Sequence, residues 1–152
     1  MITHKNLQSN AEALVNIWEI NHRDVLIHAL PIFHVNGLFV ALNTILISGA
    51  KMIFFQRFSP NAIIEKLNEA TLMMGIPTFY SRLLSNNNFN KKKCKNIRLF
   101  ISGSAPLTEI IFHEFYSKIG QKILERYGMS EAGMISSNPL RGDRRAGTAV
   151  SY

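Results

Sequence analysis

The sequence predicts an α/β domain in which a mostly parallel β-sheet carries helices on both faces. Short, charge-poor segments with branched side chains alternate five times with segments whose apolar residues recur at helical spacing. The chain has 152 residues, of which 47% are hydrophobic and 18% are charged, which is the composition of a globular domain. This length leaves no room for a second domain of full size.

The expected strands share a short length, few charges and many branched or aromatic side chains, as strands buried on both faces do. They lie at residues 25–30, 52–55, 71–76, 97–101 and 122–127. Because every pair is separated by a helical segment and not by a tight turn, the order favours parallel pairing.

Helices are expected between these strands, and several have a recognisable start or stop. Thr3 can cap the first helix, and Ser59 followed by Pro60 begins another, with the hydroxyl as cap. A short helix is expected at residues 78–84. Gly120 ends the helix that precedes the last strand.

The segment between Asp24 and Lys51 contains no charged residue and is long enough to cross a bilayer. Pro31 and Gly37 interrupt it, and unpaired polar groups are costly in lipid. A buried strand followed by a buried helix at residues 38–47, apolar almost all round, is therefore favoured over a transmembrane helix.

The single cysteine, Cys94, excludes an internal disulfide framework and a zinc site built from several cysteines. It lies in the lysine-rich segment 86–95, where neighbouring cations can lower a thiol pKa, and the chemistry inferred below does not require it. Residues 1–10 carry no secretory signal. These features favour a reducing compartment, either the cytoplasm or an organellar matrix.

The chain is basic, with 17 Lys and Arg against 10 Asp and Glu and a formal net charge of +7. Such a field attracts anions and leaves a nucleic-acid-binding module as one alternative. The basic clusters at residues 91–95 and 141–145 have no interleaved aromatic residues and form no recognition-helix pattern. A nucleic-acid partner is therefore not expected.

Ligands of open parallel sheets bind beyond the carboxyl ends of the strands, so the segments that follow the strands are the candidate binding segments. These segments are rich in small or hydrogen-bonding residues, and they comprise residues 34–37, 75–78, 102–106 and 128–131. Their coincidence at one edge of the sheet predicts a binding site.

The segment Glu125-Arg126-Tyr127-Gly128-Met129-Ser130-Glu131 carries the strongest local signal. Tyr127 can stack on a planar base, Ser130 offers a hydroxyl group, and Glu131 offers an oxygen ligand for Mg²⁺. The plainer alternative is a strand, a glycine turn and a helix capped by Ser130. Residues 102–106 leave room for a flat ring, and their plainer alternative is likewise a turn.

Three motifs taken together favour a binding site over plain turns. They are PIFHVNGL at 31–38, ISGSAPL at 101–107 and ERYGMSEAG at 125–133. In order and spacing they resemble the adenylate-forming acyl-CoA synthetases of the AMP-binding superfamily. Within that superfamily the malonyl-CoA synthetases are similar to longer local stretches, namely LIHALPIFHVNGLFVALN, GIPTFYSRLL, RLFISGSAPL and ERYGMSEAGM. The resemblance extends from ITHKNL to RRAGT, over nearly the whole chain. It implies part of that family's large N-terminal domain, with its sheet and helices.

The resemblance assigns roles to individual residues of the nucleotide site. The residues implied to bind nucleotide are Ser104, Ala105, Pro106, Glu125, Arg126, Tyr127, Gly128, Met129 and Ser130. Catalytic roles are implied for Ser130 at the α-phosphate, where the family usually has threonine, and for Glu131, which would help to hold Mg²⁺.

For the acyl substrate, the resemblance implies that Arg82 binds the distal carboxylate and that His34 and Ser104 stand beside the acyl group. The plainer alternatives are a solvated helix residue for Arg82 and a core histidine for His34. The implied reaction joins a carboxylate to CoA with ATP, releasing AMP and diphosphate, and requires Mg²⁺.

The family's phosphate loop, ribose-binding aspartate, hinge and C-terminal domain have no counterpart in these 152 residues, and residues 149–152 depart from the family pattern. Residues 1–152 are therefore expected to be an internal part of the AMP-binding domain and inactive alone. The remaining alternative is a non-catalytic remnant that binds nucleotide or a partner. Nothing in the sequence indicates an oligomeric state.

Overall fold

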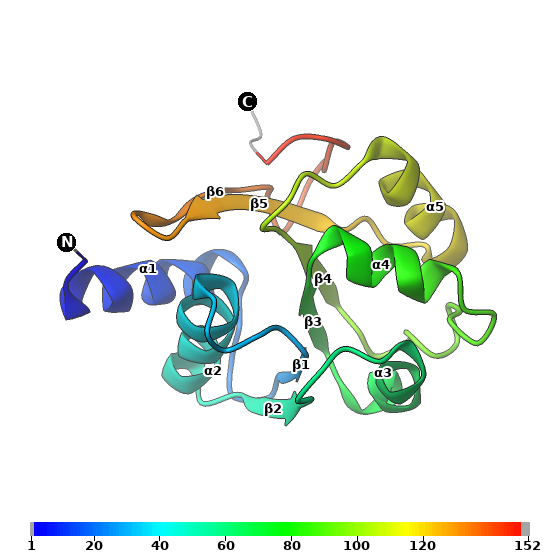
Figure 1. Ribbon diagram of the computed structural model, residues 1–152, viewed down its shortest axis with the longest axis horizontal. Coiled ribbons are helices and arrows are strands. Elements are labelled where there is room, and N and C mark those ends of the chain that lie inside the picture. The colour runs from blue at the N-terminus through cyan, green and yellow to red at the C-terminus, as the bar shows by residue number, and fades with distance from the viewer. Residues whose placement is uncertain (1, 150–152) are drawn as a thin grey trace.

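The computed structural model describes residues 2–149 and contains a six-stranded sheet in the order β2-β1-β3-β4-β5-β6 (Figure 1). The first five strands in the chain pair in parallel, and β6 pairs antiparallel with β5. The strands are β1 (Val25–His28), β2 (Lys51–Phe54), β3 (Leu72–Gly75), β4 (Leu99–Ser102), β5 (Leu124–Met129) and β6 (Gly133–Ser137). The predicted parallel α/β architecture is confirmed.

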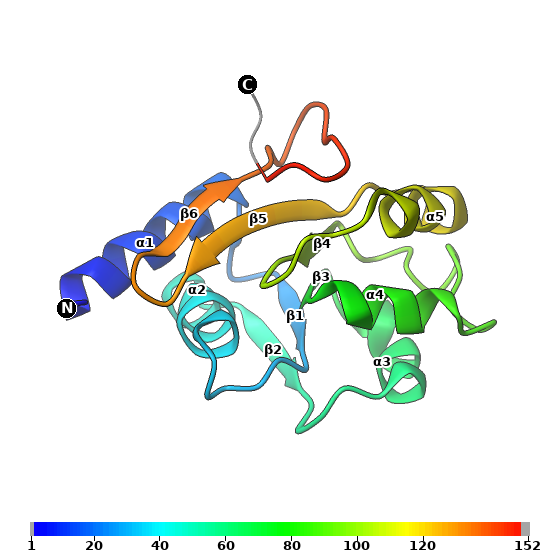
Figure 2. The same ribbon diagram turned by 45° about the horizontal axis from the view of Figure 1, so that its top comes forward.

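Helices cover both faces of this sheet, as Figures 1 and 2 show. One face carries α1 (His4–Ile17), the π-helix η1 (Asn36–Leu42) and α2 (Asn43–Ser48). The other carries α3 (Pro60–Lys66), the short 3₁₀-helix η2 (Leu67–Glu69), α4 (Pro77–Leu84) and α5 (Glu109–Ile119). The central strands β3 and β4 are buried along their whole length between these layers.

Two of the predicted helix boundaries are confirmed by their hydrogen bonds. The Thr3 side chain accepts a bond from the Asn6 N–H, and the Asn6 side chain accepts one from the Thr3 N–H, which forms a capping box at the start of α1. Gly120 ends α5 in the left-handed conformation with φ 82°. The third boundary differs: Ser59 makes no side-chain cap, so α3 begins at Pro60 without the expected hydroxyl.

The structure after residue 129 shows that one alternative for the motif at residues 125–131, a glycine turn followed by a helix capped by Ser130, is wrong. No helix follows Ser130 as far as residue 149, and residues 130–132 form a turn between β5 and β6. Gly128 permits this hairpin, because a Cβ atom there would lie 2.4 Å from the Gly133 carbonyl oxygen. Gly133 itself has φ +72°, which favours glycine. The motif residues 125–129 therefore lie within a strand.

The helix expected at residues 38–47 is present, but it starts as a π-helix, and its apolar residues are buried only as far as Ile45. Val40 and Ala41 are buried, whereas Leu46 is 68% exposed. The α2 segment packs against α1, and its other side has no cover among the described residues. Across residues 2–149 no helix is long and apolar enough to cross a membrane.

Cys94 corrects a further expectation. The side chain is buried in the core with 1% of its surface exposed, although the surrounding lysines are exposed. Burial raises the pKa of the Cys94 thiol to about 12. The lysines do not lower this pKa because removal of the sulfur from water disfavours the thiolate.

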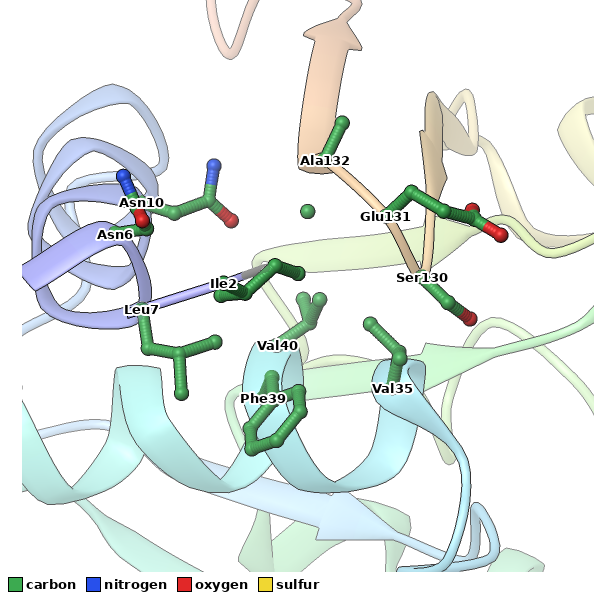
Figure 3. A pocket seen from close by; sticks show the side chains of 11 residues that line it. Ile2, Asn6, Leu7, Asn10, Val35, Phe39, Val40, Ser130, Glu131 and Ala132 are labelled. Atoms are coloured by element: carbon green, nitrogen blue, oxygen red, sulfur yellow. The ribbon is translucent and has the colours of Figure 1, made fainter. Parts of the chain in front are cut away.

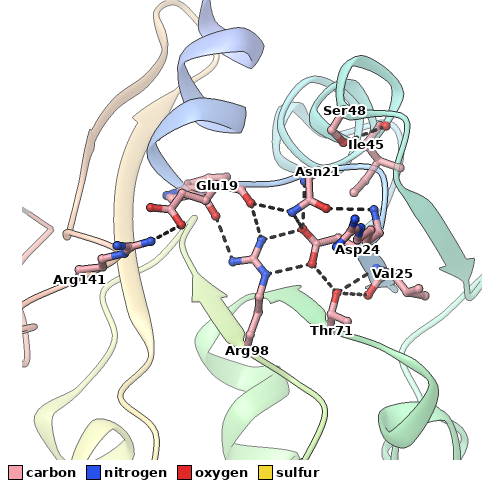
Figure 4. A network of polar contacts seen from close by, with 11 residues as sticks. Glu19, Asn21, Asp24, Val25, Ile45, Ser48, Thr71, Arg98 and Arg141 are labelled. Atoms are coloured by element: carbon pink, nitrogen blue, oxygen red, sulfur yellow. Dashed lines mark hydrogen bonds and ion pairs between the residues drawn. The ribbon is translucent and has the colours of Figure 1, made fainter.

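A polar network joins the amino ends of three adjacent strands (Figure 4). Asp24, Thr71 and Arg98 each stand one residue before β1, β3 and β4. Arg98 donates to both carboxylate oxygens of Asp24 at 2.9 and 2.7 Å, and the Thr71 hydroxyl donates to Asp24 at 2.7 Å. Arg98 also donates to the carbonyl oxygens of Trp18 and Glu19 after α1.

This network sets the ionisation of Asp24. Burial alone would raise the pKa of the Asp24 carboxyl, but the hydrogen bonds from Arg98, Thr71 and the Asn21 N–H outweigh it and lower the pKa. The ionised form is therefore the one that the folded chain stabilises.

Replacing Asp24 with Asn is expected to lower the free energy of unfolding by about 2 kcal/mol, because Arg98 loses its anion at a site only partly open to water. Chemical denaturation at neutral pH measures the change. The exposed Lys66–Glu69 pair is the control, and Lys66→Ala is expected to cost less than about 0.5 kcal/mol. Equal losses in the two variants would contradict a special role for the network.

His28 predicts a pH dependence of stability. Its ring is fully buried 5.5 Å from the Phe54 ring, and neither nitrogen has a hydrogen-bond partner among residues 2–149. Burial lowers the pKa of His28, so below about pH 6.5 the unfolded chain binds a proton that the folded chain excludes. Stability is therefore lost as the pH falls from 7 towards 5.

His28→Phe is expected to flatten this pH profile by up to about 1.4 kcal/mol per pH unit. Denaturation curves of both proteins at several pH values measure the difference between them. Burial raises the pKa of Glu125, so this residue makes the folded chain more stable as the pH falls. Its effect is the same in both proteins and does not change the difference between their profiles. Parallel profiles for the two proteins would show that His28 is not the source.

Candidate functional site

The largest cavity described at the carboxyl ends of the strands is a central pocket of about 500 Å³. Its lining comes from the loop after β1, the start of η1, the loops after β3 and β4, and the β5–β6 hairpin. The lining residues are Leu30, Pro31, His34, Val35, Asn36, Gly37, Ile76, Ser104, Arg126, Gly128, Met129, Ser130 and Met134. A cavity thus lies at the edge of the sheet where a binding site was predicted.

Arg126 is the main charged group of the central pocket. The residue is only 5% exposed, and its Nε has no hydrogen-bond partner among the described residues. No acidic side chain in residues 2–149 forms an ion pair with it. Burial lowers its pKa to about 10, which leaves the guanidinium positively charged at neutral pH. A buried cation without an anion is costly, so this group is suited to a ligand carboxylate or phosphate.

Gly103 makes room for this guanidinium. A Cβ atom at Gly103 would lie 2.3 Å from Cζ of Arg126. Only a residue without a side chain lets the arginine lie against the backbone here. The glycine between Ser102 and Ser104 therefore has a steric role that its position in a turn did not reveal.

Ser104 stands between the central pocket and a neighbouring cavity. Its backbone has φ +68°, an uncommon conformation for a residue other than glycine. The Asn36 side chain donates a 2.9 Å hydrogen bond to the Ser104 hydroxyl. Because Asn36 is buried at the start of η1, this bond ties the loop after β4 to the π-helix.

The neighbouring cavity, called here the outer pocket, has a volume of about 390 Å³. It brings together most of the residues expected to bind a nucleotide: Ser104, Ala105, Pro106, Glu125, Arg126, Tyr127 and Gly128. Tyr127 is about half exposed and can offer its ring to a base. Glu125 is buried, and its carboxylate accepts a bond from the Gly147 N–H at 3.1 Å.

Ser130 and Glu131 lie on the β5–β6 turn, next to the other two cavities. Both line a third cavity of about 280 Å³, the turn pocket, which Figure 3 shows between α1, η1 and the turn. Ser130 also lines the central pocket. In residues 2–149 no group of three acidic, histidine or cysteine side chains could hold a metal ion. Glu131 therefore offers a single exposed carboxylate.

Of the residues expected at the acyl group, His34 and Ser104 line the central pocket and Arg82 does not. Arg82 is exposed on α4, where its Cζ lies 5.0 Å from the centre of the Phe58 ring. Its expected role thus stays a prediction. Asn36 was not named as a site residue from the sequence. A polar residue at the start of an apolar helix could have indicated it.

The chain belongs to the AMP-binding enzyme family, which its residues 1–151 match. The mostly parallel six-stranded sheet with helices on both faces is the fold expected for this family.

Relatives and solved structures place the chain more closely. It is 36% identical to a malonate–CoA ligase of Arabidopsis thaliana and 38% identical to a mitochondrial malonate–CoA ligase of Mus musculus, in each case over 96% of this chain. The structure of ATP-bound MatB from Rhodopseudomonas palustris superposes with a TM-score of 0.95 at 47% identity, over 99% of this chain. The chain spans only 27% and 28% of the two ligases and 31% of MatB.

Proposed function

We propose that this chain is part of an ATP-dependent acyl-CoA synthetase that acts on malonate or a related short dicarboxylate. In that reaction a carboxylate and ATP form an acyl-adenylate and diphosphate, and the thiol of CoA then displaces AMP. Membership of the AMP-binding family supports the reaction type. A malonyl-CoA ligase that is 34% identical has been solved with methylmalonyl-CoA and AMP bound, which supports the substrate class.

The observation that carries the proposal is the buried guanidinium of Arg126 in the central pocket, which forms no ion pair with any acidic side chain of residues 2–149. One carboxylate of a dicarboxylate must reach the α-phosphate to react, and the other needs a cation of its own. Arg126 lines both the central and the outer pocket, so it stands where acyl group and nucleotide meet. A monocarboxylate with an alkyl tail would leave this buried charge without a partner.

The nucleotide is assigned to the outer pocket, with Tyr127 against the base and the turn residues Ser130 and Glu131 towards the phosphates. Glu131 suits Mg²⁺, because this ion is often held by one carboxylate together with substrate phosphates and water. When bound, the ion would neutralise developing phosphate charge. The chain's own contribution is to orient the two anions and to hold fixed donors beside them.

The mainly neutral, hydrogen-bonded lining of the outer pocket favours a nucleotide over nucleic acid. The lysines of segment 91–95 precede β4, at the opposite end of the sheet from both pockets. The proposed partners are ATP, CoA and a small carboxylate. The proposed compartment is the cytoplasm or an organellar matrix.

Replacing Arg126 with Met is expected to erase a preference for a dicarboxylate. The probes are two non-hydrolysable adenylate analogues of similar shape, one with a malonyl and one with a butyryl group, titrated calorimetrically into the 152-residue chain. The wild-type chain is expected to favour the malonyl analogue by about thirtyfold, which corresponds to a charge-assisted pair of about 2 kcal/mol. Arg126→Met should bind the two analogues within about threefold of each other.

Arg82→Met is the matched variant, because it removes the same charge from the other arginine expected to face the acyl group. If only Arg82→Met lost the preference for the malonyl analogue, Arg82 would be the residue that binds the distal carboxylate, and the role of Arg126 would be contradicted. Equal binding of the two analogues by the wild-type chain would contradict the dicarboxylate assignment altogether. Circular dichroism verifies that each variant is folded.

Tyr127→Ala is expected to weaken AMP binding by about tenfold, since stacking of a base on an aromatic ring contributes roughly 1–3 kcal/mol. Fluorescence or calorimetric titration with AMP measures the loss. Tyr116, also about half exposed but on α5 and outside both pockets, is the control. Similar losses for Tyr127→Ala and Tyr116→Ala would argue against the outer pocket as the base site.

A further inference from the structure

The turn that carries Ser130 and Glu131 has little support of its own. It is closed by a 3.2 Å hydrogen bond from the Ala132 N–H to the Met129 carbonyl. The pairing of β5 with β6 shifts its register between Tyr127 and Gly128, just before the turn. The turn pocket lies beneath it, so side-chain packing from that direction is incomplete. Another contact must fix where the turn stands.

Asn10 of α1 supplies such a contact from 124 residues away. Its Nδ2 donates to the Met134 carbonyl at 3.0 Å, and the Met134 N–H donates to its Oδ1, also at 3.0 Å. The carboxamide thus pairs with both backbone groups of one residue on β6, as a neighbouring strand would. In Figure 3 the Asn10 side chain reaches from α1 towards the turn.

The geometry around Gly133 shows how closely the two elements fit. A Cβ atom at Gly133 would lie 2.9 Å from the Asn10 Oδ1, so no side chain fits between them. The same residue has φ +72°. Glycine is therefore needed both for the turn and for the approach of Asn10, and the contact is specific to this backbone conformation.

We propose that Asn10 is a positioning residue for the nucleotide site: it holds the β5–β6 turn so that Ser130, which lines the central pocket, and its neighbour Glu131 are presented to the nucleotide. The roles of Ser130 and Glu131 at the phosphates rest on the proposed function. The hold of Asn10 on the turn rests on the hydrogen bonds alone.

The chain offers a matched control in Trp18, the residue after the last turn of α1. Its Nε1 donates to the Ser137 hydroxyl at 3.0 Å. Trp18→Phe therefore loosens the same pair of elements at the opposite end of β6, away from the turn. Both variants loosen the contact of α1 with β6, and only Asn10→Ala acts on the turn.

Hydrogen exchange on the 152-residue chain, followed by NMR, tests the hold of Asn10 on the turn. Asn10→Ala is expected to speed amide exchange at Ala132 and Met134 by about tenfold and to leave residues 136–138 unchanged. Trp18→Phe is expected to do the reverse. Unchanged exchange at the turn in Asn10→Ala would overturn the proposal.

Titration with the malonyl-adenylate analogue tests the consequence for the site. Asn10→Ala is expected to bind about five- to tenfold more weakly than the wild-type chain, and Trp18→Phe is expected to match the wild type. Equal losses in both variants, or none in Asn10→Ala, would reduce Asn10 to a structural residue and overturn the proposal.

The two experiments separate this proposal from the proposed function. If the wild-type chain binds no analogue, the proposed function fails, while faster exchange confined to the turn in Asn10→Ala still supports the hold of Asn10. If the wild type binds and Asn10→Ala leaves exchange and affinity unchanged, the function stands and the positioning role fails.

Discussion

One charged interaction at the amino edge of the sheet constrains its three adjacent strands β1, β3 and β4. Asp24, Thr71 and Arg98 occupy the same place relative to their strands, one residue before β1, β3 and β4, and a bidentate ion pair with a bridging hydroxyl joins them. Parallel strands pair without tight turns to fix their register. This network adds a side-chain link between β1, β3 and β4 at their amino ends, and the pockets form beyond their carboxyl ends.

At the carboxyl edge, β5 contributes side chains to both pockets. Glu125 and Tyr127 line the outer pocket and not the central one, whereas Arg126 between them lines both. One strand thus presents an aromatic ring to the outer pocket and a cation to the boundary between the two pockets. Gly103 and the left-handed Ser104 make this possible, the first by leaving space for the guanidinium and the second by forming the shared wall.

Much of this could be predicted from the sequence, because local rules decide it. Runs of hydrophobic residues predict the strands. Thr3 predicts the cap of α1 and Gly120 predicts the end of α5, because each acts over only a few neighbouring residues. The hairpin after residue 129 was missed since it depends on close backbone approach at Gly128. The burial of Cys94, the missing partner of Arg126 and the contact of Asn10 with Met134 are tertiary facts, invisible to any local pattern.

A crystal structure of the chain with the non-hydrolysable malonyl-adenylate analogue tests the central claim most directly. We expect adenine against Tyr127 in the outer pocket and the distal carboxylate within hydrogen-bond distance of the Arg126 guanidinium. A carboxylate bound to another cation, or an analogue bound outside both pockets, would contradict it.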